Sequence, residues 1–375
     1  MSGTTGPFGT RRDQDAQPCT VIRTRNLDQV FAMASTSKKA TARETLLRRA
    51  RQRGRGRRAR APAEIPTKGW KDVLYRVYDA LWEDRIMLIA AGATFYLLLA
   101  LFPALTAFVS VYGFLADRAT VAGNTSLLIG ILPIDSVNLI RLQLEALAAQ
   151  DTKVLSLGFF IGLSVALWSA NNGIKAIFEA LNVAYSENES RSFLKLNVVS
   201  FVFTFSGIFF GIILITTLGI IPRLLTLFGL DGWNAALVSL ARWPLTAVVV
   251  AGAISVIYRF GPDREHAKWR WLSWGAVLAT LVWMITSAGF TFYLTNFADY
   301  NATYGALGAV AGLMVWTWIS VIVLILGAEL NAELEHQTAI DTTTGDPLPM
   351  GERGATVADT LGESVNETGS KKPSS

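Results

Sequence analysis

The first residues in this sequence that could do chemistry are carboxylates at the end of the last apolar segment. Glu329 and Glu333 lie four residues apart in LGAELNAELE, so a helix would place them on one face, with Asn331 between them. Ionisable groups inside or beside a membrane span are costly and often functional, which makes Glu329 a candidate ion- or proton-linked carboxylate at a cytoplasmic mouth. The alternative is a helix-end acid that is exposed to water or paired with a lysine.

A second polar cluster follows the second apolar segment and consists of Asn171, Asn172, Lys175 and Asn182. The run Asn171–Gly173 offers a place for a helix to break and to present backbone groups to a ligand. An ordinary helix end is the alternative. We also expect that Lys175 could pair with Glu329 across a helical bundle.

The uncharged stretch from Ala90 to Phe114 contains three further candidates, Thr94, Tyr96 and Pro103. With its apolar flanks, a straight helix here would run to roughly 45 Å, against a hydrocarbon core of about 30 Å. The segment must tilt, kink at Pro103, or leave part of itself outside the lipid. We predict a kink at Pro103 that turns Thr94 and Tyr96 toward the other polar groups.

Tyr304 is the last candidate and lies before the final apolar segment, on the predicted outer face. A GxxxG pair, Gly308 and Gly312, follows it, and another occurs at Gly207 and Gly211. Such pairs favour close helix packing over ligand binding.

Enzyme motifs are missing from the chain. It has one cysteine, Cys19, and two histidines, His266 and His336, and it contains no HxH, HExxH, CxxC or GxSxG run. No Walker A loop or dinucleotide-binding GxGxxG is present either. We therefore expect no catalytic residue, no metal site, no cofactor and no enzymatic activity.

Composition places these residues in a membrane protein. The chain is 51% hydrophobic and 17% charged, whereas soluble domains carry about 25% charged residues. Apolar segments follow one another at 90–114, 154–170, 194–221, 235–260, 271–294 and 305–330. From Trp70 to Trp82, apolar residues recur at helical spacing and aromatic residues stand at both ends, which predicts an interfacial helix. The predicted fold class is an all-α integral membrane protein with six transmembrane helices and this cytoplasmic interfacial amphipathic helix.

Charge orients the spans and composition sets the boundaries. The connections at 171–195 and 259–270 are richer in lysine and arginine than the opposite ones, so both termini are predicted to be cytoplasmic. We expect a disordered basic leader at 1–68, a membrane domain at 69–335 and a disordered polar tail at 336–375.

The leader carries an arginine run at Arg48–Arg60. It could bind anionic headgroups or nucleic acid, or only enforce orientation; we expect headgroups and no specific nucleic acid, with a homo-oligomer also possible. No cleavable signal peptide is visible. Met33 begins a run typical of a natural start, so residues 1–32 are expected to be an upstream extension.

Four motifs, in the same order, resemble the YihY/virulence factor BrkB family of bacterial inner-membrane proteins over about residues 70–335. They are AAGATFYLLLALFP, LWSANNGIKAIFEALNVAY, YRFGPDREHAKWRW and TYGALGAVAGLMVW with LGAELNAELE. The resemblance implies six helical spans in one α-helical domain in the plasma membrane. The motif positions it carries over are Phe95, Tyr96, Pro103, Trp168, Asn182, Tyr185, Gly261, Pro262, Tyr304, Gly305, Glu329 and Asn331.

These observations lead to three hypotheses of function. The first is a transporter or exporter of a lipid-like or amphipathic solute. The second is an envelope-integrity or scaffold protein that transports nothing, in which the polar clusters lock helices together. The third, a membrane ribonuclease, follows an old label of the family, and the missing catalytic residues argue against it.

Overall fold

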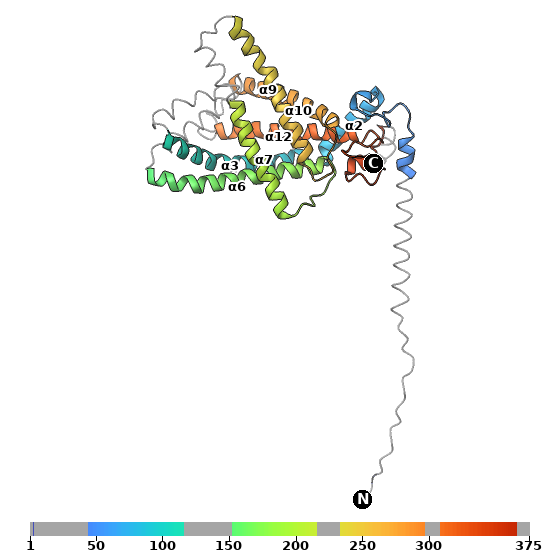
Figure 1. The fold of residues 1–375 in the computed structure, drawn as a ribbon, viewed down its shortest axis with the longest axis horizontal. Coiled ribbons are helices and arrows are strands. Elements are labelled where there is room, and N and C mark those ends of the chain that lie inside the picture. Colours follow the sequence, from blue (N-terminus) through green and yellow to red (C-terminus); the bar gives the residue numbers. More distant parts are fainter. Residues whose placement is uncertain (1–2, 4–43, 116–151, 216–232, 297–307, 366–375) are drawn as a thin grey trace. The chain divides into compact units, whose positions relative to one another are not determined.

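The computed structural model divides the chain into two units, Met1–Arg51 and Gln52–Ser375 (Figure 1). The residues that the structure describes are 3, 44–115, 152–215, 233–296 and 308–365. In the first unit, residues 44–50 are helical. The candidate residues from Thr94 to Asn331 lie in the second unit.

Helices account for all the named elements. In chain order they are η1 (Pro62–Glu64), α2 (Thr67–Glu83), α3 (Ile86–Leu115), α6 (Thr152–Ala184), α7 (Phe193–Ile215), α9 (Trp233–Phe260), α10 (Trp269–Asn296), α12 (Gly308–Glu335) and α13 (Thr356–Asp359). An isolated antiparallel bridge joins Ala267 and Thr343, and the described ranges contain no β-strand. The all-α prediction is confirmed.

Four of these helices are long and apolar enough to cross a membrane, within the part of the chain that the structure describes. The four segments are Phe193–Gly211, Trp243–Phe260, Trp269–Asn296 and Val310–Glu335. The bent pair α2–α3 raises the number to five if it is one span. The second predicted span lies on α6, whose C-terminal half also carries polar residues. Six spans therefore stay a prediction.

The sharp change of direction at the first apolar stretch lies upstream of the predicted place. α2 and α3 meet at an angle of 61°. Between them Arg85 adopts φ 50°, in the left-handed region that residues other than glycine rarely visit. Pro103 stands inside α3 without ending it. The chain thus turns at residues 84–85 before α3 begins.

The apolar stripe of α2 divides between two neighbourhoods. Val73 and Val77 are buried, and the same helix packs against α12. Leu74, Tyr78 and Trp82, spaced four residues apart, remain exposed. An exposed apolar row beside a buried one suits a helix lying at a membrane surface, so the interfacial location stays a prediction that this pattern favours.

Close helix packing is found at glycines outside the two GxxxG pairs. A methyl group on Gly275 of α10 would collide with the carbonyl oxygen of Gly327 in α12. By contrast, no residue of the described ranges comes within 4 Å of a Cβ added to Gly207, Gly211 or Gly312. Within those ranges the GxxxG prediction is wrong for these three residues, and the tight crossing is between α10 and α12.

α12 is the element that the other helices share. It packs against α2, α3, α6 and α10, and α3 and α6 lie side by side (Figure 1). Small residues permit this approach: Ala90 and Ala93 of α3 and Ala180 of α6 are buried in one apolar core with Ala328 of α12.

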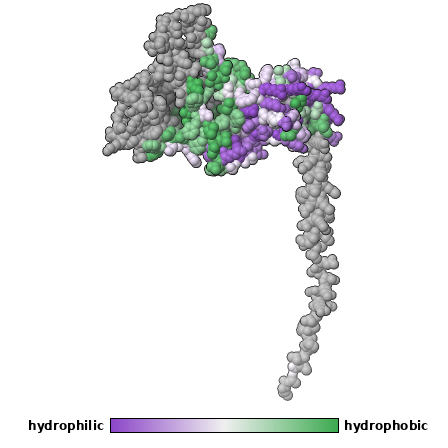
Figure 2. All heavy atoms as spheres, in the orientation of Figure 1, coloured by the Kyte–Doolittle hydropathy of each residue, from purple (hydrophilic) through white to green (hydrophobic). Residues whose placement is uncertain are grey.

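The predicted disordered tails, 1–68 and 336–375, include residues that are folded. Residues 52–66 and 336–365 are hydrogen-bonded to each other. We call these two segments the cap. Thr338 donates a hydrogen bond of 2.7 Å to the carbonyl of Ala59, and the Arg57 guanidinium donates one of 2.7 Å to that of Gly362. Figure 2 shows hydrophilic residues gathered at the cap end of this unit and hydrophobic ones over the neighbouring helices. Hydrogen bonds from polar side chains to backbone carbonyls hold the cap together. The polar composition of these segments predicted disorder because it does not show which distant carbonyls the side chains reach.

The α10–α12 crossing gives a first prediction. Gly275→Ala is expected to lower the free energy of unfolding by about 1–3 kcal/mol, because the helices must separate to admit the methyl group. Thermal unfolding of the detergent-solubilised protein measures this. The matched control, Gly289→Ala in the same helix, meets open space and is expected to be neutral or to stabilise by about 0.4–1 kcal/mol. Equal effects of the two substitutions would contradict the close crossing.

Candidate functional site

The last two turns of α12 carry four polar side chains that meet different neighbours. They are Glu329, Asn331, Glu333 and Glu335. Because successive residues of a helix point in different directions, these side chains reach α2, α10, the connection at 261–268 and the cap.

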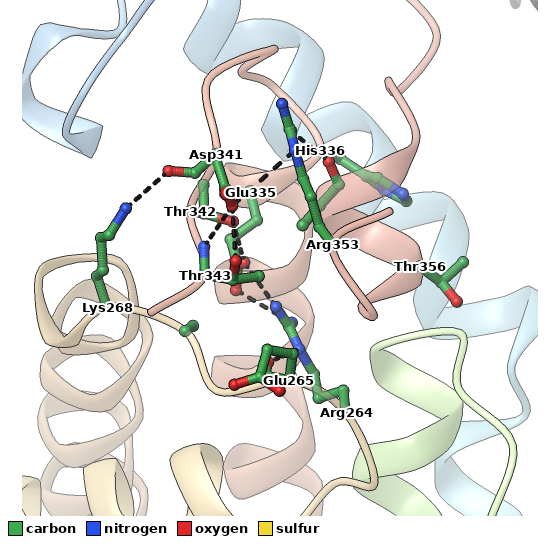
Figure 3. Close-up of polar contacts among 12 residues, drawn as sticks. Arg264, Glu265, Lys268, Glu335, His336, Asp341, Thr342, Thr343, Arg353 and Thr356 are labelled. Carbon is green, nitrogen blue, oxygen red and sulfur yellow. Dashed lines mark hydrogen bonds and ion pairs between the residues drawn. The ribbon is translucent and has the colours of Figure 1, made fainter. Parts of the chain in front are cut away.

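Glu335 forms a buried ion pair with Arg264 (Figure 3). Its carboxylate lies 2.8 Å from the guanidinium, and the two side chains are 0% and 2% exposed. Thr342 of the cap donates a further hydrogen bond of 2.7 Å, and Arg264 lies over the ring of Tyr185 at 4.8 Å. Burial opposes the charge on Arg264, but Glu335 outweighs it and raises the pKa of the guanidinium. This contact holds three segments together.

Glu333 is also paired. Arg76 of α2 forms an ion pair with it, and His336 lies 3.4 Å from its other oxygen. The same arginine donates a hydrogen bond of 2.8 Å to the carbonyl of Glu363 in the cap. Glu333 therefore joins α12 to α2 and, through Arg76, to the cap.

Asn331 connects α12 to the backbone of α10. Its amide oxygen accepts a hydrogen bond of 2.8 Å from the Gly275 nitrogen, and its amide nitrogen donates one of 3.0 Å to the Leu272 carbonyl. Asn331 is fully buried. A residue engaged on both sides with helix backbone has a structural role, as the locking hypothesis expects.

Glu329 differs from its neighbours. Its side chain is buried and faces the side chain of Asp84, at the bend between α2 and α3. Its Oε1 atom is buried and makes no hydrogen bond within the described ranges. Asp84 was missed by the sequence reasoning; a signal for it was its position as an acid between the amphipathic stripe and the first apolar stretch.

The predicted partnership of Lys175 with Glu329 is wrong. The Lys175 ammonium lies 5.6 Å from the centre of the Trp168 ring and 5.9 Å from that of Phe193. These are the distances of cation–π contacts. Lys175 therefore belongs to the contact between α6 and the start of α7.

The predicted break at Asn171–Gly173 is also absent, since α6 is one helix from Thr152 to Ala184. Asn171 is fully buried and donates a hydrogen bond of 3.3 Å to the side chain of Asn197 in α7. A methyl group on Gly173 would lie 2.8 Å from Leu97 of α3. Asn172 is partly buried in the same stretch. This part of the cluster joins helices.

Asn182, in the last turn of α6, contacts ion-paired residues that follow the helix or lie in the 261–268 connection. It accepts a hydrogen bond of 2.8 Å from the Asp263 nitrogen and donates one of 3.1 Å to Glu189. The Arg191 guanidinium, 2.6 Å from Glu189, holds the pKa of that carboxyl below its usual range. Burial opposes the charge on Asp263, but hydrogen bonds from Ser190 lower its pKa.

The remaining candidates are Thr94, Tyr96 and Pro103 on α3, and Tyr304. Thr94 is buried and bonds its hydroxyl to the Ala90 carbonyl at 2.7 Å, one turn back in its own helix. Tyr96 is 38% exposed and packs edge to face on Phe95. Pro103 lies within the helix. Tyr304 lies outside the described residues. Within the described ranges, neither Thr94 nor Tyr96 is hydrogen-bonded to Glu329, so the predicted convergence stays a prediction.

Metal coordination finds no support in the described part of the chain. No group of three or more histidine, cysteine, aspartate or glutamate side chains there is placed to hold an ion. The acids at the end of α12 instead meet arginine, backbone or another acid.

Several apolar helices joined by a polar cap define a helical membrane protein, and the comparisons agree. The sequence profile described as Virulence factor BrkB matches residues 77–349, and the chain belongs to this family. No solved structure matches it significantly.

Named relatives of the chain include membrane proteins of several bacteria. It is 31% identical over 66% of its length to the ribonuclease-like protein YfkH of Bacillus subtilis, of which 90% is covered. It is 26% identical over 68% of its length to a UPF0761 membrane protein of Tolumonas auensis, of which 82% is covered. A UPF0761 membrane protein of Photobacterium profundum is 24% identical over 71% of the chain and 82% of the relative.

The buried ion pair gives a second prediction. Glu335→Gln leaves the charge of Arg264 buried without a counterion, so the free energy of unfolding is expected to fall by roughly 3–5 kcal/mol. Thermal unfolding in detergent measures the loss. The control is Glu265→Gln, at an exposed position in the same connection, with an expected change within about 0.5 kcal/mol. If the two variants unfold alike, the pair does not hold the connection to α12.

Proposed function

We propose that this protein is a multi-pass transporter or exporter of a lipid-like or amphipathic solute in the bacterial inner membrane. Six spans with both termini cytoplasmic belong to this proposal, as does binding of anionic headgroups by arginines of the 48–60 region. Exposed Arg53, Arg58 and Arg60 support the last point, whereas Arg55 is engaged by Asp72 at 2.6 Å. A homo-oligomer is part of the same expectation.

The observation that carries the proposal is the contrast between Glu329 and the other acids near it. Glu333, Glu335 and Glu189 each form an ion pair with an arginine. Glu329 is also buried, at 2% exposed, yet the side chain that faces it is that of another acid, Asp84. A carboxyl group kept out of water without a cation destabilises the fold. Such residues in apolar helices typically serve ion or substrate movement.

The scaffold alternative has its own support. Asn331, Glu333 and Glu335 connect α12 to α10, α2 and the cap, and all of these contacts are accounted for by helix locking. A locked end of a bundle is what an envelope-integrity protein needs. It also serves a transporter, which requires a fixed part against which other helices move, so these contacts alone favour neither function.

The ribonuclease name of the Bacillus relative does not enter this proposal. His336, the histidine nearest the acidic residues of α12, contacts Glu333 and lies 2.8 Å from the Thr360 hydroxyl of the cap. A nuclease needs a base or metal placed to act on a phosphodiester. The acids nearby are engaged by arginines in ion pairs that hold helices together.

A third prediction tests transport. Purified protein in liposomes is expected to move fluorescent short-chain phosphatidylglycerol across the bilayer, as measured by dithionite quenching, and Glu329→Gln is expected to reduce the initial rate at least tenfold. Thermal stability of this variant should stay near the wild-type value, because the substitution removes a buried acid that has no cation partner.

The matched control is Glu179→Gln, an exposed acid of α6, which should move the lipid at the wild-type rate. Wild-type vesicles that transfer no more labelled lipid than protein-free vesicles would overturn the lipid-like substrate. If, in addition, Glu329→Gln unfolds far below the wild-type temperature, the scaffold hypothesis is favoured.

A further inference from the structure

The contact between Glu329 and Asp84 has a chemical requirement that the ion pairs around it lack. An ionised carboxylate carries only hydrogen-bond acceptors, so two carboxylates cannot form a hydrogen bond with each other. The side chains of Glu329 and Asp84 nevertheless face each other. Two ionised carboxylates in this position would repel each other, so the contact favours a proton on one of them.

Burial indicates which side chain holds it. Glu329 is 2% exposed, whereas Asp84 is only partly buried at the bend between α2 and α3. Burial disfavours the charged form, so the proton belongs on Glu329, whose carboxyl group donates to the Asp84 carboxylate. Releasing this proton to water would leave two negative charges in contact.

The charged and titratable surroundings favour retention of the proton. Glu83 of α2 and Glu333 of α12 both act on this contact with negative charge. Arg76 of α2 is engaged by Glu333 and the cap, and Lys175 of α6 lies against aromatic rings. No cation that the structure describes forms an ion pair with Glu329 or Asp84.

A second buried group lies near the acids without a hydrogen bond. Tyr185, just after α6, is fully buried. By distance and angle, its hydroxyl has no hydrogen-bond partner within the described ranges, and the same is true of Glu329 Oε1. Tyr185 lies beside Asn331 and near Glu329. Burial raises the pKa of Tyr185, so its hydroxyl keeps its proton.

We propose that Asp84 and Glu329 form a proton-binding site in which one proton is shared between two carboxyl groups at the bend between α2 and α3. The site takes up one proton when it closes and releases that proton to water when the acids separate. The role of this proton as the coupling ion rests on the proposed transport function. The site itself does not, since it can be observed in protein that transports nothing.

Infrared difference spectroscopy of the purified protein in nanodiscs tests the site. Raising the pH from about 7, where ordinary carboxyl groups are already ionised, to about 10 should remove the carbonyl stretch of one protonated carboxylic acid per chain, a band that shifts in D₂O. Asp84→Asn and Glu329→Gln should each lose this titrating band, and Glu179→Gln, at an exposed acid of α6, should keep it. Thermal unfolding of each variant shows that it is folded, and either folded variant is sufficient for the test.

The outcomes separate the site from its function. A titrating band that persists in Glu329→Gln, or the lack of one in the wild type, overturns the shared proton even where labelled lipid still crosses the vesicles. A band with the expected mutant pattern in protein that moves no lipid supports the site and rejects the transport proposal. Where both are present, a pH gradient across the vesicle should change the wild-type rate and leave the Asp84→Asn rate unchanged; a gradient without effect on the wild type rejects coupling.

Discussion

A charge removed from water must find a partner, and the end of α12 is built around this constraint. Glu333 and Glu335 are each satisfied by an arginine from a different segment, Arg76 of α2 and Arg264 of the 261–268 connection. Truncating one partner of such a contact is strongly destabilising even where the intact contact adds little net stability. The positions of α2, of the connection and of the cap therefore depend on where α12 places its acids.

Close approach of the helices makes these pairings possible. Gly275 and Gly327 let α10 and α12 touch along their backbones, and Asn331 then reaches the carbonyl and amide groups of α10. A buried polar group bonded on both sides specifies a unique register, since a shift by one residue would leave its donors and acceptors unsatisfied. The glycines set the distance, the asparagine sets the register, and the ion pairs follow from both.

The sequence predicted what depends on local pattern and missed what depends on distant partners. Apolar runs at helical length identified the long helices, and a carboxylate at the end of one of them identified Glu329. Asp84 becomes relevant only when the bend at Arg85 carries it to α12, which no spacing rule reveals. Its place in the arginine run at 48–60 predicts that Arg57 is exposed to solvent, yet its side chain is 2% exposed. Its donors bind carbonyls about 280 residues away, where a polar composition concealed a folded segment.

Paired acids and the acid–acid contact differ in what they imply for movement. An arginine–glutamate pair is stable at every physiological pH, so the contacts of Glu333 and Glu335 hold α2, α12 and the cap together without regard to protons. The contact of Glu329 with Asp84 exists only with a proton bound, because its ionised form has no donor and two like charges. Arginine–glutamate pairs fix the neighbouring contacts of α12, whereas the strength of this contact changes with proton concentration. A conditional contact beside the start of α3, surrounded by unconditional ones, is the arrangement that a transporter needs and a scaffold does not.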